Sequence, residues 1–453
     1  MTETRDTVET EVAVVGAGLA GLETARQLHD RNVDVRVLEA RDRVGGRTLS
    51  QELDGDMIDL GAQWIGPGQE VVNEIIEEFG IETFEQHIDG VSQFRAGGEV
   101  GRHEEVVMAL SQEAQNELFD AVAEIEAQSR EVPTDAPYDA PDADKWDSMT
   151  AATWRDRELT MQEARDAFDA SVRAVFASEP AELSWLYFLF YLRAGGGFLS
   201  LTSVEGGAQQ TRIEGGAQRI SKTMADELDG HVYLSQPVRA IKHDDEGVTL
   251  DSESLRVEAD YAVVAVPPTV AGRIRYEPPL PARRDGLTQR SPMGSVIKCI
   301  ASYEEPFWRE DDMSGEVVDA EGPVGLIMDD SPSDASSGAL VGFLFGDEGR
   351  ALADDDEMRR DVVLETFAEY FGEEALEPVG YVDHVWANEP YSGGCYAGTA
   401  APGTLTSYGE ALREPVGRIH WAGTETATEW TGYMDGAIRS GRRVAEEVAG
   451  RTG

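Results

Sequence analysis

The stretch Glu11-Val-Ala-Val-Val-Gly-Ala-Gly-Leu-Ala-Gly21 decides the fold of this chain. A short β-branched run leads into Gly16, Gly18 and Gly21, and a helical pattern follows directly. Strand, tight turn and helix in this order are the setting of a dinucleotide site: the first glycine permits the turn, the second admits a pyrophosphate, and the third lets helix and strand pack. The helix N-terminus adds amide donors and a positive dipole. We therefore predict an α/β Rossmann-like domain with these three glycines at a bound nucleotide.

A second strand and a terminal acid follow that helix. The run Val33–Leu38 is again rich in β-branched residues and leads into Glu39, 18 positions after Gly21. An acid at this place normally binds the ribose hydroxyls of a dinucleotide. The sequence therefore predicts Glu39 as a cofactor-binding residue.

The composition limits both architecture and setting. A chain of 453 residues exceeds what one hydrophobic core usually supports, so two intertwined domains are expected. The balance of 38 Lys and Arg against 87 Asp and Glu gives a formal charge of −49, spread along the whole chain. This charge disfavours a nucleic-acid partner. It indicates a salt-adapted, halophilic surface, because molar salt screens self-repulsion over about 3 Å; a cationic partner is the alternative.

Cysteines and apolar runs indicate the compartment. The two cysteines, Cys299 and Cys395, cannot form a disulfide framework for a chain of this size, and the N-terminus carries no signal-like apolar segment. No run reaches the roughly 18 apolar residues of a membrane span. We therefore expect a soluble cytoplasmic protein with no metal site, and the oligomeric state, a homodimer included, stays open.

Two stretches near the end of the chain carry most of the chemical information. They are Tyr391-Ser-Gly-Gly-Cys-Tyr396 and Gly423-Thr-Glu-Thr-Ala-Thr-Glu-Trp-Thr-Gly-Tyr433. The glycines let the backbone approach a large planar ligand, and the thiol could hold such a ligand covalently. With the nucleotide motif, they resemble the flavin-containing monoamine oxidase family of the FAD-dependent amine oxidase superfamily. The resemblance implies an FAD bound through an 8α-S-cysteinyl thioether to Cys395, and a substrate site walled by Tyr396 and Tyr433.

The same resemblance implies further contacts to FAD. The segment Ala40-Arg-Asp-Arg-Val-Gly-Gly-Arg47 resembles the second glycine motif of the superfamily, which separates FAD sites from NAD sites. Other implied contacts come from the Asp59–Pro67 loop, from the backbone of one strand, from a tryptophan nine residues before Cys395, and from the C-terminal glycine turn and helix. The implied FAD residues are Arg41, Gly46, Arg47, Gln63, Trp64, Val238, Trp386, Gly423, Thr424, Glu425 and Met434.

A lysine within an apolar strand is the next candidate. In Gly294–Tyr303, alternation places Val296, Lys298 and Ile300 on one face of a strand. A lysine there is costly unless its ammonium finds a partner. The resemblance implies that Lys298 lies beside flavin N5 through a bridging water, whereas the alternative is a lysine that reaches solvent from the strand end.

Three residues are expected to shape the substrate cavity. The resemblance implies that Gln209 lines it, although the loop around Gln209 is one residue longer than in the family. It also implies a gate at Leu326, with Leu201 opposite. An aliphatic pair predicts a roomy, undivided cavity, and no arginine is identifiable as a carboxylate clamp, which disfavours amino acids.

The expected architecture is an FAD-binding domain interleaved with an α+β substrate-binding domain, as in p-hydroxybenzoate hydroxylase and monoamine oxidase. The predicted FAD-binding domain comprises residues 1–80, 206–296 and 386–453. The predicted substrate-binding domain comprises residues 81–205 and 297–385. Within the latter, the Pro- and Asp-rich stretch from 131 to 147 reads as an exposed connection.

The predicted reaction is flavin-dependent oxidative deamination. A primary amine, or a secondary one, is held between Tyr396 and Tyr433, passes a hydride equivalent to FAD, and yields an aldehyde, ammonia and, with oxygen, hydrogen peroxide. The catalytic candidates are Lys298, Tyr396 and Tyr433. Alternatives are a polyamine oxidase, an FAD dehydrogenase or desaturase with another electron acceptor, and an FAD-binding scaffold without activity.

Overall fold

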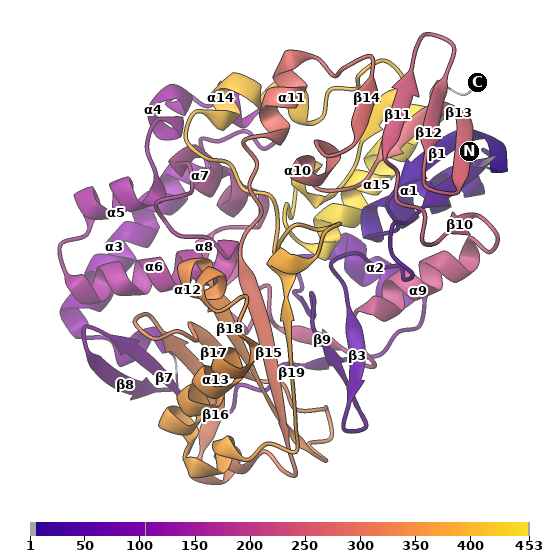
Figure 1. Cartoon of the computed structure of the whole chain (residues 1–453). Coiled ribbons are helices and arrows are strands. Elements are labelled where there is room, and N and C mark those ends of the chain that lie inside the picture. The colour runs from indigo at the N-terminus through magenta and orange to yellow at the C-terminus, as the bar shows by residue number, and fades with distance from the viewer. Residues whose placement is uncertain (1–5, 105, 452–453) are drawn as a thin grey trace.

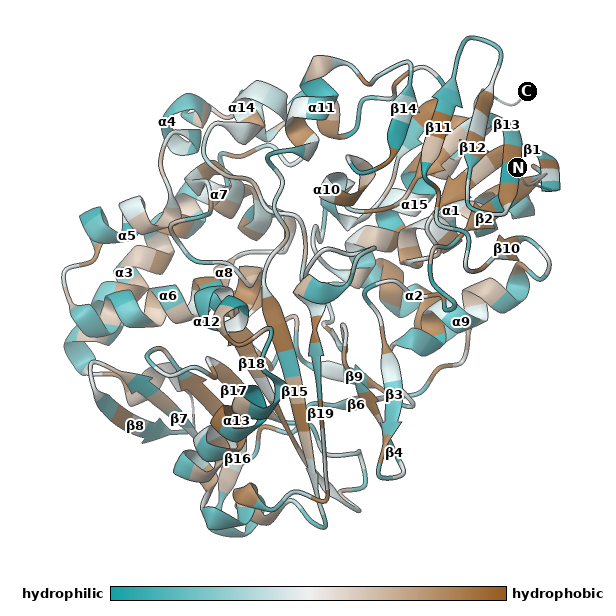
Figure 2. Cartoon of the chain, in the orientation of Figure 1, coloured by the Kyte–Doolittle hydropathy of each residue, from teal (hydrophilic) through white to brown (hydrophobic). Residues whose placement is uncertain are grey.

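The computed structural model describes residues 6–104 and 106–451. Two large β-sheets organise these residues, one around β1 (Asp6–Val15) and β13 (Leu255–Val264), the other around β15 (Val296–Tyr303) and β18 (Gly338–Phe345) (Figure 1). Hydrophobic residues concentrate on the central strands of both sheets, whereas hydrophilic and hydrophobic residues are mixed along the helices (Figure 2). The predicted α/β class is confirmed.

The first sheet contains the N-terminal strand that the sequence predicts. β1 pairs in parallel with β2 (Val35–Leu38) on one side and β13 on the other. Val12 and Val14 belong to one core and Ala13 to the core on the opposite face, so both faces of β1 are buried. In sheet order the strands are β10 (Val232–Tyr233), β2, β1, β13, β12 (Val248–Asp251), β11 (Ala240–His243) and β14 (Arg275–Glu277), with β20 (Ile419–Trp421) paired to β13.

Helices far apart in sequence cover the face of this sheet that carries Val12 and Val14. The helices that share this core are α1 (Leu19–Asp30), α2 (Glu70–Glu78), α9 (Gln218–Glu227) and α15 (Met434–Ala449). α1 and α15 approach closely, because a Cβ on Gly441 would lie 2.6 Å from the Ala20 carbonyl oxygen. The chain therefore returns at its C-terminal end to pack on the first helix.

The second sheet is built around β15 and β18 and is covered on one face by a helix. α13 (Asp356–Phe371) covers the face that carries Ile297, Cys299 and Ala301, and the alternating residues Val296 and Ile300 face the opposite core, as predicted. In sheet order the strands are β19 (Gly380–Val385), β15, β18, β17 (Leu326–Asp329), β16 (Met313–Asp319), β7 (Val91–Ala96) and β8 (Glu99–His103).

A helical layer stands next to this sheet (Figure 1). Its helices are α3 (Gln112–Ser129), α4 (Ala143–Asp147), α5 (Ala151–Glu158), α6 (Gln162–Phe176), α7 (Trp185–Ala194) and α8 (Phe198–Thr202). They share an aromatic core in which Trp154 and Trp185 stack at 4.5 Å. The expectation of an exposed connection at 131–147 is wrong in part: Val132 and Trp146 are buried in this core, because a few apolar residues suffice to dock the stretch.

Smaller elements complete the fold. They are β3 (Ser50–Leu53), β4 (Asp56–Asp59), β5 (Trp64–Ile65), β6 (Thr83–Glu85), β9 (Thr211–Ile213), α10 (Pro268–Ala271), α11 (Ala282–Thr288), α12 (Gly346–Ala351) and α14 (Thr404–Tyr408). β9 pairs with β5 and β6, so strands from both predicted domains join one small sheet. The exact domain boundaries stay a prediction. None of the helices in the described ranges is both long and apolar enough to cross a membrane.

Candidate active site

One cavity of about 1050 Å³ lies between the first sheet, the second sheet and the helical layer. It extends from the end of β1 and the turn before α1 to strands β16 and β17 and helices α3 and α6. With two exceptions, Gly21 and Glu425, every residue predicted for the site lines it. Side chains from remote parts of the chain therefore meet around one space.

The end of the cavity at the first sheet has the geometry of a nucleotide cradle. Gly16 has φ +101°, which L side chains rarely adopt, and nothing lies within 4 Å of a Cβ built on Gly18. Gly21 lies behind this surface, because its Cβ would lie 2.0 Å from the Gly16 carbonyl oxygen. The glycines thus occupy the turn, the open face and the packing position. Glu39 lines the same end, accepts a hydrogen bond from the Ala17 backbone N–H at 2.7 Å, and is buried.

Two arginines at this end are held by carboxylates that lie far away in the sequence. Arg41 donates to Glu389 at 2.6 Å, and Arg47 donates to Glu425 at 2.7 Å and to the Tyr396 carbonyl at 2.8 Å. Burial opposes ionisation of Glu425, but the Arg47 guanidinium and its hydrogen bonds outweigh it and hold the pKa of the carboxyl below its usual range. Glu425 therefore positions Arg47 and does not itself line the cavity.

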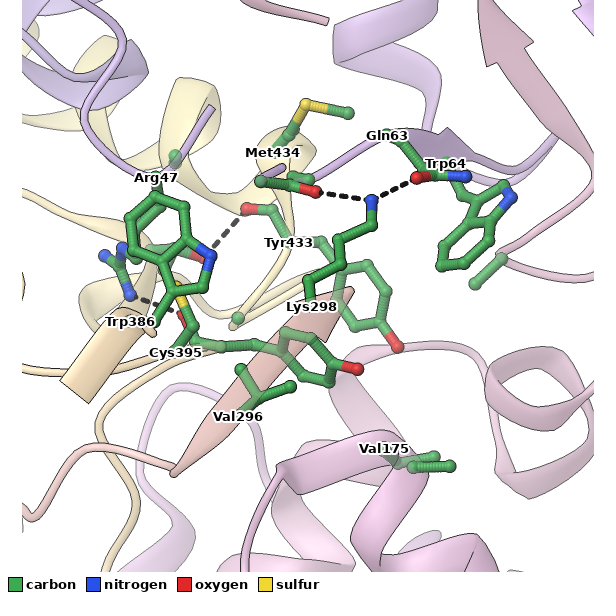
Figure 3. A pocket seen from close by; sticks show the side chains of 18 of the residues that line it. Arg47, Gln63, Trp64, Val175, Val296, Lys298, Trp386, Cys395, Tyr433 and Met434 are labelled. Carbon is green, nitrogen blue, oxygen red and sulfur yellow. Dashed lines mark hydrogen bonds between the residues drawn. The ribbon is translucent and has the colours of Figure 1, made fainter. Parts of the chain in front are cut away.

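Lys298 of β15 lines the cavity. Its side chain is 3% exposed, and its ammonium donates to the Gly61 carbonyl at 3.1 Å and to Gln63 Oε1 (Figure 3). The ammonium also lies 5.5 Å from the centre of the Trp64 ring. Burial lowers the pKa of Lys298 to about 8, against the opposing effect of two nearby carboxylates, Asp330 first and then Asp59. The alternative of a lysine that reaches solvent is therefore wrong.

A polar network that the sequence did not indicate supports Lys298 and Gln63. Gln63 donates to Asp330 Oδ1 at 2.9 Å, and Arg212 pairs with the same oxygen at 2.9 Å. Asp59 accepts from the Ala217 backbone at 3.0 Å, and burial raises its pKa to about 6. In the sequence, only the adjacent acids Asp329 and Asp330, at the end of the stretch from 323 to 330, hint at this network.

Cys395, Tyr396 and Tyr433 meet at the cavity, and Figure 3 shows the labelled Cys395, Tyr433 and Met434 around the same space as Lys298. The peptide bond between Cys395 and Tyr396 is cis. Burial raises the pKa of the Cys395 thiol to about 12 and those of both phenols above their usual range. Tyr433 is supported by the ring of Trp430 at 5.3 Å. The two tyrosines therefore present neutral aromatic surfaces.

The remaining predicted residues lie along the walls. Trp386 donates to the Leu60 carbonyl at 2.9 Å, and Gln209 donates to the Leu201 carbonyl at 3.1 Å. Leu201 is buried and Leu326 half-buried, both at the cavity surface. The predicted FAD contacts that also line the cavity are Gly46, Trp64, Val238, Gly423, Thr424 and Met434. Their roles stay predictions.

The residues present fit an FAD. The open face at Gly18, the buried carboxylate of Glu39 and the arginines Arg41 and Arg47 suit ribose and diphosphate groups. The volume of about 1050 Å³ lies at the upper end of the roughly 300–1,000 Å³ of small-molecule sites, in keeping with a large cofactor.

Known proteins with similar sequences point the same way. Residues 19–449 match the family described as flavin containing amine oxidoreductase. Over 442 residues, 97% of each chain, the sequence is 40% identical to a Dictyostelium discoideum protein named "Probable flavin-containing monoamine oxidase A". It is 38% identical over 453 residues to the flavin-containing amine oxidase B of Homo sapiens, which covers 97% of this chain and 86% of the human one.

Solved structures agree. Wild-type putrescine oxidase bound to putrescine matches with a TM-score of 0.94 at 33% identity, over 98% of this chain and 100% of that chain. Cyclohexylamine oxidase from Brevibacterium oxydans IH-35A matches with a TM-score of 0.93 at 32% identity, over the same shares. The chain therefore belongs to the flavin-containing amine oxidoreductase family, and it is a flavin-dependent amine oxidase.

Proposed function

We propose that this chain oxidatively deaminates primary amines to aldehyde and ammonia, with oxygen as the electron acceptor and hydrogen peroxide as the second product. Secondary amines are a further class to test. The observation that carries the proposal is that Lys298, Cys395, Tyr396 and Tyr433 line one cavity with the nucleotide cradle at its other end.

The two tyrosines bind and orient the amine. Because burial raises the pKa of both phenols, their hydroxyls stay protonated, and their rings offer flat apolar surfaces to an unprotonated amine. Such a slot fixes the α carbon and excludes water. Bound FAD supplies the two-electron oxidation. No side-chain base is required of Ser, His or Asp.

Cys395 is the proposed attachment point of FAD. It lines the cavity and is 5% exposed, and a Gly-Gly pair precedes it. Among the similar structures are alanine-to-cysteine mutants of putrescine oxidase, described as a redesign of cofactor binding. A native cysteine in the cavity of this chain supports a covalent link here.

Lys298 is proposed to hold a water molecule at the flavin ring. Its ammonium is already bound to the Gly61 carbonyl and to Gln63, so one donor of its three is left for a water. Lys298→Met should slow flavin reoxidation by oxygen more than it weakens amine binding. Oxygen kinetics that equal those of the wild type would contradict this role.

The cavity wall favours uncharged or cationic amines. Leu201 and Leu326 form an aliphatic pair at the cavity wall, in keeping with a roomy, undivided site for arylalkylamines or long aliphatic amines. Among the described lining residues from 81–205 and 297–385, Lys298 is the only cation, and it is engaged by Gln63. Amino acids, which need a cation for their carboxylate, are therefore disfavoured.

The setting that we propose is a reducing, salt-rich cytoplasm. Both cysteines are buried and unpaired. The net charge of −49 is tolerable where salt screens it.

The test is acid precipitation of the purified yellow protein, with flavin absorbance read in pellet and supernatant and with bleaching by tyramine measured without oxygen. We expect flavin in the pellet and bleaching. Cys395→Ala should release the flavin and keep the fold. The matched control Cys299→Ala should retain the flavin in the pellet. Flavin that stays with Cys395→Ala would refute the attachment site, and flavin that no amine bleaches would favour a dehydrogenase or desaturase.

A further inference from the structure

The cavity continues beyond the tyrosines to a second end. This end is formed by β7, β16, α3 and α6, and it is lined mainly by apolar side chains: Phe94, Leu118, Phe119, Val122 and Val318. One carboxylate, Glu316 of β16, lines the same cavity. A carboxylate in an apolar wall is costly unless it meets a hydrogen-bond donor or a cation.

Glu316 has a polar support but no cationic partner. Its Oε2 accepts from Ser92 Oγ at 2.7 Å, and Ser92 Oγ lies 2.9 Å from Ser314 Oγ. Among the described residues, no Lys, Arg or His is found in an ion pair with it, and no charged neighbour contributes to its pKa. Burial raises the pKa of the Glu316 carboxyl, and only the Ser92 hydrogen bond opposes this. One carboxylate oxygen therefore has room for a ligand.

The strand is shaped to present Glu316. The pairing of β16 with β7 is irregular here. Met313 pairs with Val91 and Val317 pairs with Gln93, so β16 advances four residues where β7 advances two. Gly315, directly before Glu316, has φ +83°, and a Cβ on it would lie 2.8 Å from Asp329 Cβ. Such irregularities redirect a side chain next to a binding site.

Glu316 lies far from Lys298 on the same sheet. β15 and β16 are separated by β18 and β17, and the register runs from Lys298 to Phe343, Leu326 and Val318. At about 4.8 Å per strand spacing, the two strands lie roughly 14 Å apart. An extended chain gains about 1.2 Å per bond. About twelve bonds would thus span the distance between the strand of Lys298 and the strand of Glu316.

The charges of the cavity wall divide along its length. The arginines among the described lining residues are Arg41, Arg47, Arg239 and Arg273, which all come from the segments at the nucleotide end. The acidic lining residues outside that end are Glu316 and the exposed Glu104 and Glu205. The field therefore favours an anion at one end and a cation at the other.

We propose that Glu316 is a second anchor of the substrate site, which binds a cationic group about twelve bonds from the reacting nitrogen. Preferred substrates are then long α,ω-diamines or polyamines. This inference rests on the proposed amine oxidase function and adds a substrate class to it.

The experiment compares matched monoamines and α,ω-diamines, from four to twelve carbons, with benzylamine as a short reference. Kinetics are measured for the wild type, Glu316→Gln, Glu316→Leu and the control Glu304→Gln, which removes the same charge from an exposed site. Glutamine keeps an acceptor for Ser92, so the fold should be retained. Binding a charged group through a charged partner contributes enough for an effect of about tenfold or more.

In the wild type we expect long diamines to have a KM at least about tenfold below monoamines of equal length, and butane-1,4-diamine to show no such advantage. Glu316→Gln should raise the KM of long diamines about tenfold and leave kcat and KM for benzylamine unchanged. Glu316→Leu should reverse the preference, and Glu304→Gln should match the wild type. Equal diamine preference in wild type and Glu316→Gln, or a uniform loss for every amine, would overturn the anchor while the proposed function stands. Flavin that benzylamine and all other amines leave oxidised would overturn both.

Discussion

Replacing Lys298 by methionine tests whether the site keeps a buried ammonium at the expense of stability. Lys298 is 3% exposed, and burial lowers its pKa from the ordinary 10.5 to about 8 despite the Asp330 and Asp59 carboxylates. A pKa difference of one between the folded and unfolded states corresponds to about 1.4 kcal/mol. The charged form of Lys298 is therefore less stable in the folded protein than in the unfolded chain by about 3 kcal/mol. That penalty applies in full below pH 8.

The sign of the pH dependence follows from proton binding. Between about pH 8 and 10.5 the unfolded chain keeps the lysine proton that the folded protein has released. The free energy of unfolding therefore rises with pH through this window, by up to about 3 kcal/mol from this single group. Lys298→Met should lack that rise. At pH 7 the substitution removes the penalty of the buried charge and so raises the free energy of unfolding. About 1–2 kcal/mol of this increase is lost again, because the Gly61 carbonyl and Gln63 lose a hydrogen-bond donor.

The assay is urea unfolding followed by circular dichroism at constant salt, at pH 7, 8.5 and 10. The control is Lys222→Met, which removes an exposed lysine of α9. We expect the wild type to gain stability relative to Lys298→Met as the pH rises, and to keep a constant difference from Lys222→Met. A wild-type minus Lys298→Met difference that is flat from pH 7 to 10 would refute the reasoning.

Three further predictions concern the site and the surface. Tyr433→Phe should keep most of kcat/KM for benzylamine, because the neutral ring and not the hydroxyl orients the amine, whereas Tyr433→Ala should lose at least about tenfold; steady-state kinetics decide, and equal losses in both would sink this role. Glu425→Ala should destabilise the protein by about 3 kcal/mol, because it leaves the Arg47 guanidinium without its carboxylate at 2.7 Å. Glu425→Gln keeps a hydrogen-bond acceptor for Arg47 and should therefore lower the free energy of unfolding less than Glu425→Ala does. Equal urea midpoints for the two variants would count against the Arg47–Glu425 pairing. Dilution from molar to 0.1 M salt should lower Tm in a scan, since the net charge of −49 is then less screened; a constant Tm would contradict a salt-adapted surface.

Local patterns predicted the parts of the site that are contiguous in sequence. The turn at Gly16 and Gly18 and the acid at Glu39 follow from one strand-turn-helix-strand unit, and alternation along β15 placed Lys298 on the face opposite Cys299. These features need only neighbouring residues, so a single sequence suffices.

The supporting carboxylates could not be predicted in this way. Glu389 meets Arg41 across 348 positions and Asp330 meets Gln63 across 267, and neither has a local pattern that marks its partner. Glu316 follows a strand irregularity that no periodicity signals. Such pairs depend on how the two sheets approach each other, which the tertiary fold alone determines.

The distribution of charge in the cavity matches the anionic cofactor and the cationic substrate that we propose for it. The first sheet brings Arg41 and Arg47 to the nucleotide end, where carboxylates from remote segments fix their orientation. The second sheet brings Glu316 to the other end, where no lining cation neutralises it in the described chain. Lys298 lines the same cavity, and with a pKa of about 8 it keeps its charge near neutral pH and loses it at higher pH. Opposite ends of the cavity therefore favour ions of opposite sign at contact distance, whereas molar salt would screen the chain-wide negative charge beyond about 3 Å.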